Sequence, residues 1–294
     1  MNTHFDFTFQ KFTEIIDCLQ NNGYSFQSLE DFLVKPCVKV VVLRHDVDRS
    51  PLHSLKTAKF ENSRGIKGTY YFRIVNQSFN PSVIKEIAAL GHEIGYHYED
   101  VSLAAERQKI KAKRQKFRSN LISDLQDRKT ARLQDYERLE KELADIAIVC
   151  FSQNLNKLRE LALVKTICMH GSPMSRWDSR ILWKYYNYRD FGIIGEPYFD
   201  IDFEKVLYLT DTGRKWNGEK SSVRDKVFQE NFIELKRKLK ISDNILDAAT
   251  ANELPLQMMI TVHPQRWSDN PFSWMSEYAS QTLKNCIKQL MFVR

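Results

Sequence analysis

The stretch Val40-Val41-Val42-Leu43-Arg44-His45-Asp46-Val47-Asp48-Arg49 decides how the rest of the chain is interpreted. Its β-branched and aliphatic residues predict a buried parallel strand over 38–45, and this strand ends at residues that bind metals or move protons. Chemistry at the carboxyl end of a strand is typical of α/β enzymes. Asp46 and Asp48 can both face one cavity, where a cation or a proton relieves their repulsion. The alternative is an Asx-type turn that caps the next helix.

The same order of elements recurs along the chain. Strands, each followed by a polar cluster, are predicted at 38–45, 68–73, 93–96, 165–169, 206–209 and 257–262. Helices are predicted at 7–20, 52–63, 81–90, 147–163, 227–240, 243–252 and 276–291. Strands that alternate with helices imply a parallel sheet, and a barrel brings all carboxyl ends to one mouth. We therefore expect one α/β domain over 1–294, with a mouth that collects Asp46, Asp48, His97, His170, Asp211 and His263.

Residues 101–146 differ from the rest in composition. Charged and amide side chains dominate, apolar residues thin out, and no Gly or Pro interrupts the segment. This composition predicts an exposed helical hairpin, inserted after the third strand, that contributes little to the core. If the protein acts by binding a protein partner, we expect this hairpin to be the contact.

The charge and composition exclude several classes of protein. The net charge is +7, and the segment from Arg107 to Arg118 alone holds seven basic residues and no acidic one. A basic run on a helix is usually solvated, and no nucleic-acid-binding motif accompanies it, so we expect no nucleic acid as partner. Five widely spaced cysteines without a CxxC pair indicate neither a disulfide framework nor a zinc ribbon. Without a signal-like amino terminus or a membrane-length apolar run, we expect a cytoplasmic protein with no transmembrane segment.

The residues at the predicted mouth suit a metal-dependent hydrolase. Carboxylate oxygen and neutral imidazole bind zinc, and a catalytic site with three protein ligands keeps one position for water, whose pKa falls to about 7. Asp48, His97 and a third group are candidates for these ligands. Asp46 is then placed to take a proton, and His263 to give one to a leaving amine. The alternatives are a core histidine at His97 and a turn residue at His170.

Three motifs, in chain order, resemble one family. They are Arg44-His45-Asp46-Val47-Asp48, Gly91-His92-Glu93-Ile94-Gly95-Tyr96-His97 and Ile260-Thr261-Val262-His263-Pro264. They resemble the polysaccharide deacetylase family, also called NodB-homology or carbohydrate esterase family 4. The resemblance implies a distorted (β/α)7 barrel that removes N- or O-acetyl groups from sugars with a divalent metal, usually zinc. It also implies that Asp46 is the base, Asp48 and His97 are metal ligands, and His263 is the acid.

This chain departs from the family pattern at two places. The family has a second ligand His four residues after the first, where this chain has Val101. The usual Arg-Pro-Tyr motif is replaced by His170-Gly171-Ser172-Pro173. The third ligand is therefore predicted to be His170, with Glu99 as the alternative. The residues predicted to contact the substrate are Arg44, Arg73, Tyr98, Asp211, Arg214 and Trp267.

We therefore expect a metal-dependent deacetylase that cleaves the amide (or ester) of an acetylated sugar in a surface-polysaccharide pathway. One rival is a hydrolase of the same fold that cuts a non-sugar amide. The other is an inactive deacetylase-like protein that binds a glycan or a partner. Val101 favours the inactive protein, whereas the presence of Asp46, Asp48, His97 and His263 together favours the enzyme.

Overall fold

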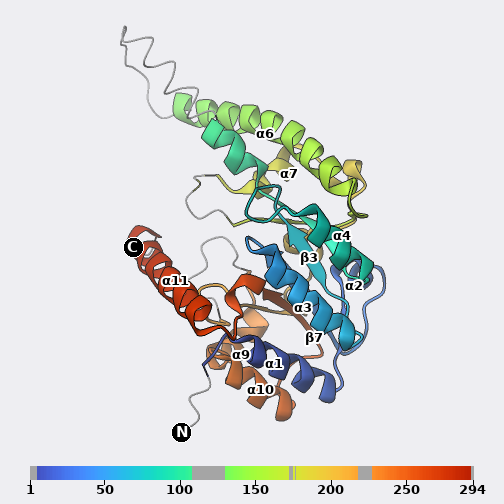
Figure 1. Ribbon diagram of the computed structural model, residues 1–294. Coiled ribbons are helices and arrows are strands. Elements are labelled where there is room, and N and C mark those ends of the chain that lie inside the picture. The colour runs from blue at the N-terminus through green and yellow to red at the C-terminus, as the bar shows by residue number, and fades with distance from the viewer. Residues whose placement is uncertain (1–4, 108–129, 172–174, 176, 218–226, 293–294) are drawn as a thin grey trace.

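One parallel sheet forms the centre of the computed structural model, which describes residues 5–107, 130–171, 175, 177–217 and 227–292 (Figure 1). The strands run in the order β5-β4-β3-β2-β7-β6, and β1 pairs with β2. All of these pairs are parallel. The strands are β1 (Ser25–Gln27), β2 (Val40–Val47), β3 (Thr69–Phe72), β4 (Glu93–Tyr98), β5 (Ile167–Met169), β6 (Leu207–Thr210) and β7 (Gln257–Val262).

The predicted α/β class and parallel sheet are confirmed. Within the described residues no pairing joins β5 to β6, so the sheet is a curled half-barrel rather than a closed one. The pairs of β2 with β3 and β7 put Arg44 opposite Thr69 on one side and Thr261 on the other. β2 is therefore central in the sheet, which is why every residue from Val40 to Val47 is buried.

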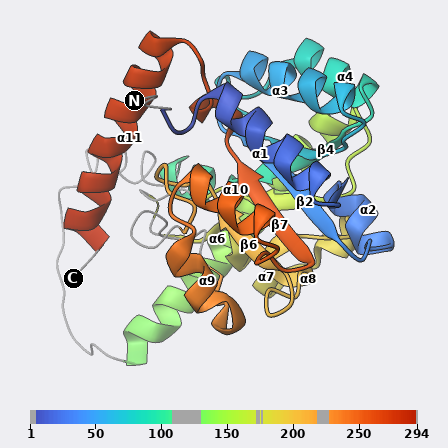
Figure 2. The same cartoon turned by 90° about the horizontal axis from the view of Figure 1, so that it is seen from below.

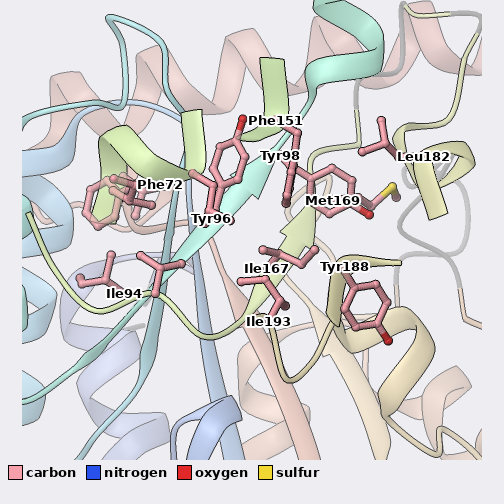
Figure 3. Packing of buried hydrophobic residues seen from close by; sticks show 14 of the residues in the cluster. Phe72, Ile94, Tyr96, Tyr98, Phe151, Ile167, Met169, Leu182, Tyr188 and Ile193 are labelled. Atoms are coloured by element: carbon pink, nitrogen blue, oxygen red, sulfur yellow. The ribbon is translucent and has the colours of Figure 1, made fainter. Parts of the chain in front are cut away.

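Helices cover the outer face of the sheet. α1 (Phe9–Asn21) and α10 (Ser242–Thr250) pack on β2, β6 and β7. α3 (Pro51–Ser63), α4 (Pro81–Ala89) and α6 (Thr130–Arg159) pack over β3, β4 and β5, and Figure 3 shows part of this cluster. α11 (Pro271–Phe292) runs along one side of the molecule in both views (Figures 1 and 2). The shorter helices are α2 (Leu29–Val34), α7 (Leu182–Tyr185), α8 (Pro197–Asp200) and α9 (Ile233–Lys238).

The alternation of side chains along each strand separates two faces. A compact apolar cluster fills the inner face, which we define by Val40, Val42, Tyr71, Cys168, Tyr208 and Met259. Side chains of α2 join it near the amino ends of the strands. The polar residues that continue the same alternation, such as Asp46 on β2 and His97 on β4, must lie on this inner face toward the carboxyl ends. Tyr71 fits beneath them because Gly95 has no Cβ, which would lie 2.2 Å from the Tyr71 ring.

One predicted boundary needs correction, and two segments hold elements that the sequence pattern did not predict. Residues 24–35 contain the three-residue strand β1 and the helix α2. The third predicted strand does not end at Tyr96, because β4 continues through Tyr98 and carries His97 within it. The aromatic segment 177–203, too irregular to predict, holds α7, α8 and two short 3-10 helices.

The predicted insertion at 101–146 falls only partly within the described residues. Residues 100–107 are helical, α6 begins at Thr130, and 108–129 lie outside the described part. Both flanks pack into the core, where the buried side chains include Val101, Ala104 and Leu143. The expectation that the whole segment contributes little to the core is therefore wrong for its flanks.

None of the five cysteines, all of which lie in the described part of the chain, forms a disulfide, as their spacing predicted. A search of the described helices finds no segment that is both long and apolar enough to cross a membrane.

Candidate metal centre

Three of the predicted histidines, at the carboxyl ends of β4, β5 and β7, gather around the carboxylate of Asp48, which follows β2. Nε2 of His97 lies 3.6 Å from Oδ1 of Asp48, and Nε2 of His170 lies 3.4 Å from the same oxygen. Nε2 of His263 lies 3.7 Å from the other oxygen, Oδ2. Strand alternation explains this convergence, since each of these residues follows the inner-face positions of its own strand.

Asp48, His97 and His170 fit a divalent metal. Each offers one ligand atom, and the three atoms all lie within 4.8 Å of one another. Oδ1 of Asp48 is buried and has no hydrogen-bond donor among the described residues. An unsatisfied buried polar atom of this kind costs on the order of 1–3 kcal/mol, so an oxygen left in this state points to a ligand. One carboxylate and two imidazoles are a donor set that zinc accepts.

The other ring nitrogen of each histidine ligand is held by a neighbour. Nδ1 of His97 lies 3.0 Å from the Cys168 carbonyl oxygen, and Nδ1 of His170 lies 3.1 Å from Oε2 of Glu99. When Nδ1–H donates to these oxygens, Nε2 keeps its lone pair and faces Asp48, as metal-binding histidines require. Glu99 is itself fixed by two hydrogen bonds from Arg73, at 2.8 Å each. His170 therefore belongs to the candidate ligand group of Asp48, His97 and His170, and Glu99 lies behind it.

Asp46 lies deeper than Asp48 on the inner face and is paired with Arg44. Nε and Nη2 of Arg44 donate to the two carboxylate oxygens at 2.8 and 2.7 Å. Oδ2 of Asp46 lies 3.7 Å from Nε2 of His97. Burial alone would raise the pKa of Asp46, but the charges of Arg44 and His97 outweigh it and hold this pKa well below its usual range. Asp46 is therefore ionised whenever the protein is folded near neutral pH.

His263 is held by Asp211 from the neighbouring strand β6. Nδ1 of His263 lies 2.6 Å from Oδ1 of Asp211, whose other oxygen accepts the His263 backbone N–H at 2.8 Å. Arg266 and Trp267 donate to the same carboxylate, at 2.6 and 2.8 Å. Burial and Arg266 act to lower the pKa of His263, but Asp211 and Asp48 outweigh them, so this pKa is raised. His263 therefore holds its proton more tightly than a free imidazole does.

Sequence reasoning missed two residues of this region. Cys168 forms a second candidate ligand group with Asp46 and His97, in which the ligand atoms again lie within 4.8 Å. One signal in the sequence pointed to Cys168, because it precedes His170 by two residues and so lies on the same strand face. In the structure it also pairs in register with His97. Arg266, which holds Asp211, lies in the turn that follows His263, and no pattern in the sequence marks it.

The residues predicted to contact substrate occupy different positions. Arg44, Tyr98, Asp211 and Trp267 are buried, with 0–3% of each residue exposed. The Arg214 guanidinium lies over Phe7 and Trp274, 4.9 and 4.7 Å from their ring centroids. Arg73 is bound to Glu99, as described above. Contact of these six residues with a substrate stays a prediction, whereas their contacts within the protein support the metal centre or the packing of α11.

The titration of His97 predicts a pH dependence of stability. Burial lowers the pKa of His97 from 6.5 to about 4, although the carboxylates of Asp46 and Asp48 raise it. As the pH falls from 6.5 to about 4, the unfolded chain takes up a proton that the folded chain does not, so the free energy of unfolding falls. We expect His97→Gln to flatten this slope in metal-free protein, measured by urea unfolding at several pH values.

His92 provides the control for this prediction. Burial also lowers the pKa of His92. His92→Gln should therefore flatten the pH dependence of the free energy of unfolding in the same direction, at a position far from the metal centre. An unchanged slope in His97→Gln would contradict the assignment of a neutral, buried imidazole to His97.

Comparison of the chain with protein-family models, with curated proteins and with solved structures finds no match. The candidate metal centre is therefore defined by the geometry of Asp48, His97 and His170, together with the flanking pairs Asp46–Arg44 and His263–Asp211.

Proposed function

We propose that the protein is a metal-dependent hydrolase that removes an acetyl group from an acetylated sugar, as members of the polysaccharide deacetylase family do. One observation carries the proposal: the candidate ligand group Asp48, His97 and His170 lies between an ionised carboxylate, Asp46, and His263, a histidine whose pKa is raised by Asp211 and Asp48. Hydrolysis of an acetamide needs a base and an acid beside one activated carbonyl. The site offers both.

Asp48, His97 and His170 would hold the metal, and their donor types favour zinc. When bound, a divalent metal polarises a carbonyl oxygen and lowers the pKa of a water molecule. Nδ1–H of each histidine is fixed by its neighbour, so the chain itself sets the direction of both imidazole lone pairs.

Asp46 is the proton acceptor in this proposal. Its pairing with Arg44 keeps the carboxylate ionised and fixes its direction toward the metal ligands. The same pairing weakens Asp46 as a base, because a lowered pKa means a lower proton affinity. The gain is a group that is ready to accept a proton at any pH near neutrality.

His263 is the proton donor. An unprotonated amine leaves poorly from a tetrahedral carbon, so cleavage of the C–N bond needs a proton delivered to the nitrogen. Asp211 accepts Nδ1–H of His263 and stabilises the imidazolium, which leaves Nε2–H on the side of Asp48. This arrangement resembles the way a buried carboxylate orients a catalytic histidine in other hydrolases.

One further feature supports the family and its distorted barrel type, and one departs from the family pattern without removing the site. The curled sheet is parallel, and its site lies at the carboxyl ends of the strands. The position where the family has its second ligand histidine is Val101, which is fully buried in the core. Because His170 enters the ligand group from β5, the loss at Val101 no longer favours an inactive protein.

A non-sugar amide is the second candidate substrate. Tyr98 and Trp267, the two aromatic residues among those predicted to contact the substrate, are 0% and 3% exposed. An acetamide outside a sugar would need only the metal ligands, Asp46 and His263.

Acetate release tests the proposal. Zinc-loaded protein would be incubated with N-acetylated oligosaccharides, O-acetylated sugars and simple non-sugar acetamides. We expect acetate from an acetylated sugar, loss of activity with a chelator, recovery with zinc, and little activity in Asp46→Asn. Acetate from the non-sugar amides alone would favour the rival hydrolase. No acetate from any of these substrates at full metal occupancy would contradict the proposal.

A further inference from the structure

Glu196 is a fully buried carboxylate beside the two strand ends that carry His97 and His170. Its Oε1 accepts hydrogen bonds from the Met169 backbone N–H at 3.1 Å and from the Tyr98 hydroxyl at 3.3 Å. Met169 directly precedes His170, and Tyr98 directly follows His97. One carboxylate oxygen therefore bridges the immediate neighbours of both histidine ligands.

We propose that Glu196 is a positioning residue of the metal centre, which fixes the spacing between the imidazoles of His97 and His170. The inference rests on the metal centre of the proposed function, but it does not depend on the reaction or the substrate.

The geometry of β5 explains why such a residue is needed. β5 is a three-residue strand at the end of the sheet order, and it pairs on one side with β4, where His170 N–H donates to the Tyr98 carbonyl at 2.8 Å. On its other side, the Ile167 N–H donates to the Gly195 carbonyl at 3.1 Å. The Glu196 side chain receives the next N–H along that side, from Met169. It therefore completes the hydrogen-bond ladder at the point where β5 delivers His170.

Glu196 is itself held in place. It is the N-cap of α8, where its Oε2 accepts the Tyr198 N–H at 2.6 Å, and its own N–H donates to Asp200 at 2.7 Å. The indole N–H of Trp183 donates to the Tyr98 hydroxyl at 2.8 Å, so that the hydroxyl proton is directed to Glu196. The side chains of Tyr98 and Met169 lie in the cluster shown in Figure 3. Hydrogen bonds therefore hold both the Glu196 side chain and the Tyr98 hydroxyl that donates to it.

Loss of the bridge should loosen the metal site. A mutation of a residue that orients metal ligands typically weakens metal affinity about 10–100-fold. We expect Glu196→Ala to raise the Kd for zinc and cobalt by about this factor, measured by competition with a chelating dye. The visible absorption of bound cobalt, which reports ligand geometry, should also shift.

Glu93 offers a matched control at the other end of β4. Its carboxylate also accepts a backbone N–H and a hydroxyl, from Glu30 at 2.9 Å and from Thr69 at 2.7 Å. Glu93→Ala should therefore destabilise the fold by a similar route, seen as a lower Tm, and leave the metal Kd within twofold of wild type. A Glu196→Ala protein with wild-type Kd and cobalt spectrum would overturn the inference, as would an equal loss of affinity in Glu93→Ala.

Glu196→Gln decides the question if the alanine variant does not fold. An amide has one acceptor oxygen, so it must turn its NH₂ group toward either the Met169 or the Tyr198 N–H. We expect a several-fold higher metal Kd, and an unchanged Kd would overturn the inference. A wild-type protein that binds no metal would instead refute the proposed metal centre itself, whereas metal binding that is insensitive to Glu196 refutes only the positioning role.

Discussion

Asp48→Ala is expected to remove the bound metal and, with it, all hydrolysis activity. Asp48 supplies the only carboxylate of the ligand group, and its Oδ1 lies within 3.6 Å of both imidazole Nε2 atoms. Without it, two neutral nitrogens remain, and they cannot offset the charge of a divalent cation. Elemental analysis after dialysis should give about one metal per wild-type chain, the occupancy of a single zinc site, and background levels in Asp48→Ala.

Asp46→Asn is the control for this experiment. Asp46 is engaged by Arg44 on both oxygens and is not in the ligand group with Asp48. The asparagine variant should keep its metal and lose its activity. Equal metal content in wild type and Asp48→Ala would refute the assignment of Asp48.

His263→Gln is expected to lower kcat/KM by about 10²–10⁴, the usual contribution of a positioned proton donor. The enzyme needs the protonated imidazole, so the activity of the wild type should fall as the pH rises through the raised pKa of His263. The variant has no such group, and its alkaline limb should be flat. The metal content should be retained, because Nε2 of His263 lies 3.7 Å from Oδ2 of Asp48, whereas Nε2 of His97 and of His170 approach Oδ1.

A pH profile of kcat/KM for both proteins, at saturating zinc, checks this expectation. His170→Gln serves as the contrast, because it should lose metal and activity together. Undiminished turnover in His263→Gln would remove His263 from the mechanism and leave Asp211 or His170 as the candidate acid.

The sequence allowed the convergence of the site to be predicted from simple periodicity. A run such as Val40–Leu43 identifies a buried parallel strand, and parallel strands bring their carboxyl ends to one edge. The convergence of Asp48, His97, His170 and His263 then follows from their places near the carboxyl ends of these strands. The exact end of β4 did not follow, because His97 is polar and the sequence gives no sign that it is buried on the inner face.

The hydrogen bonds that hold the side chains around the candidate metal centre could not be predicted in the same way. Glu99 was the alternative to His170 as third ligand, and only the structure shows that Arg73 donates to both of its oxygens. The pairing of His263 with Asp211 depends on the register of β6 and β7, which periodicity does not give. Glu196 lies in a segment of short helices without a repeating pattern, and its role depends on contacts with residues far away in sequence.

Anomalous diffraction at the zinc edge, from crystals of the full chain grown with zinc, tests the central claim most directly. If Asp48, His97 and His170 bind the metal, we expect one strong peak within coordinating distance of Asp48 Oδ1 and of Nε2 of His97 and His170. A peak bound instead by Asp46 and Cys168, or no peak on these residues at saturating zinc, would contradict it.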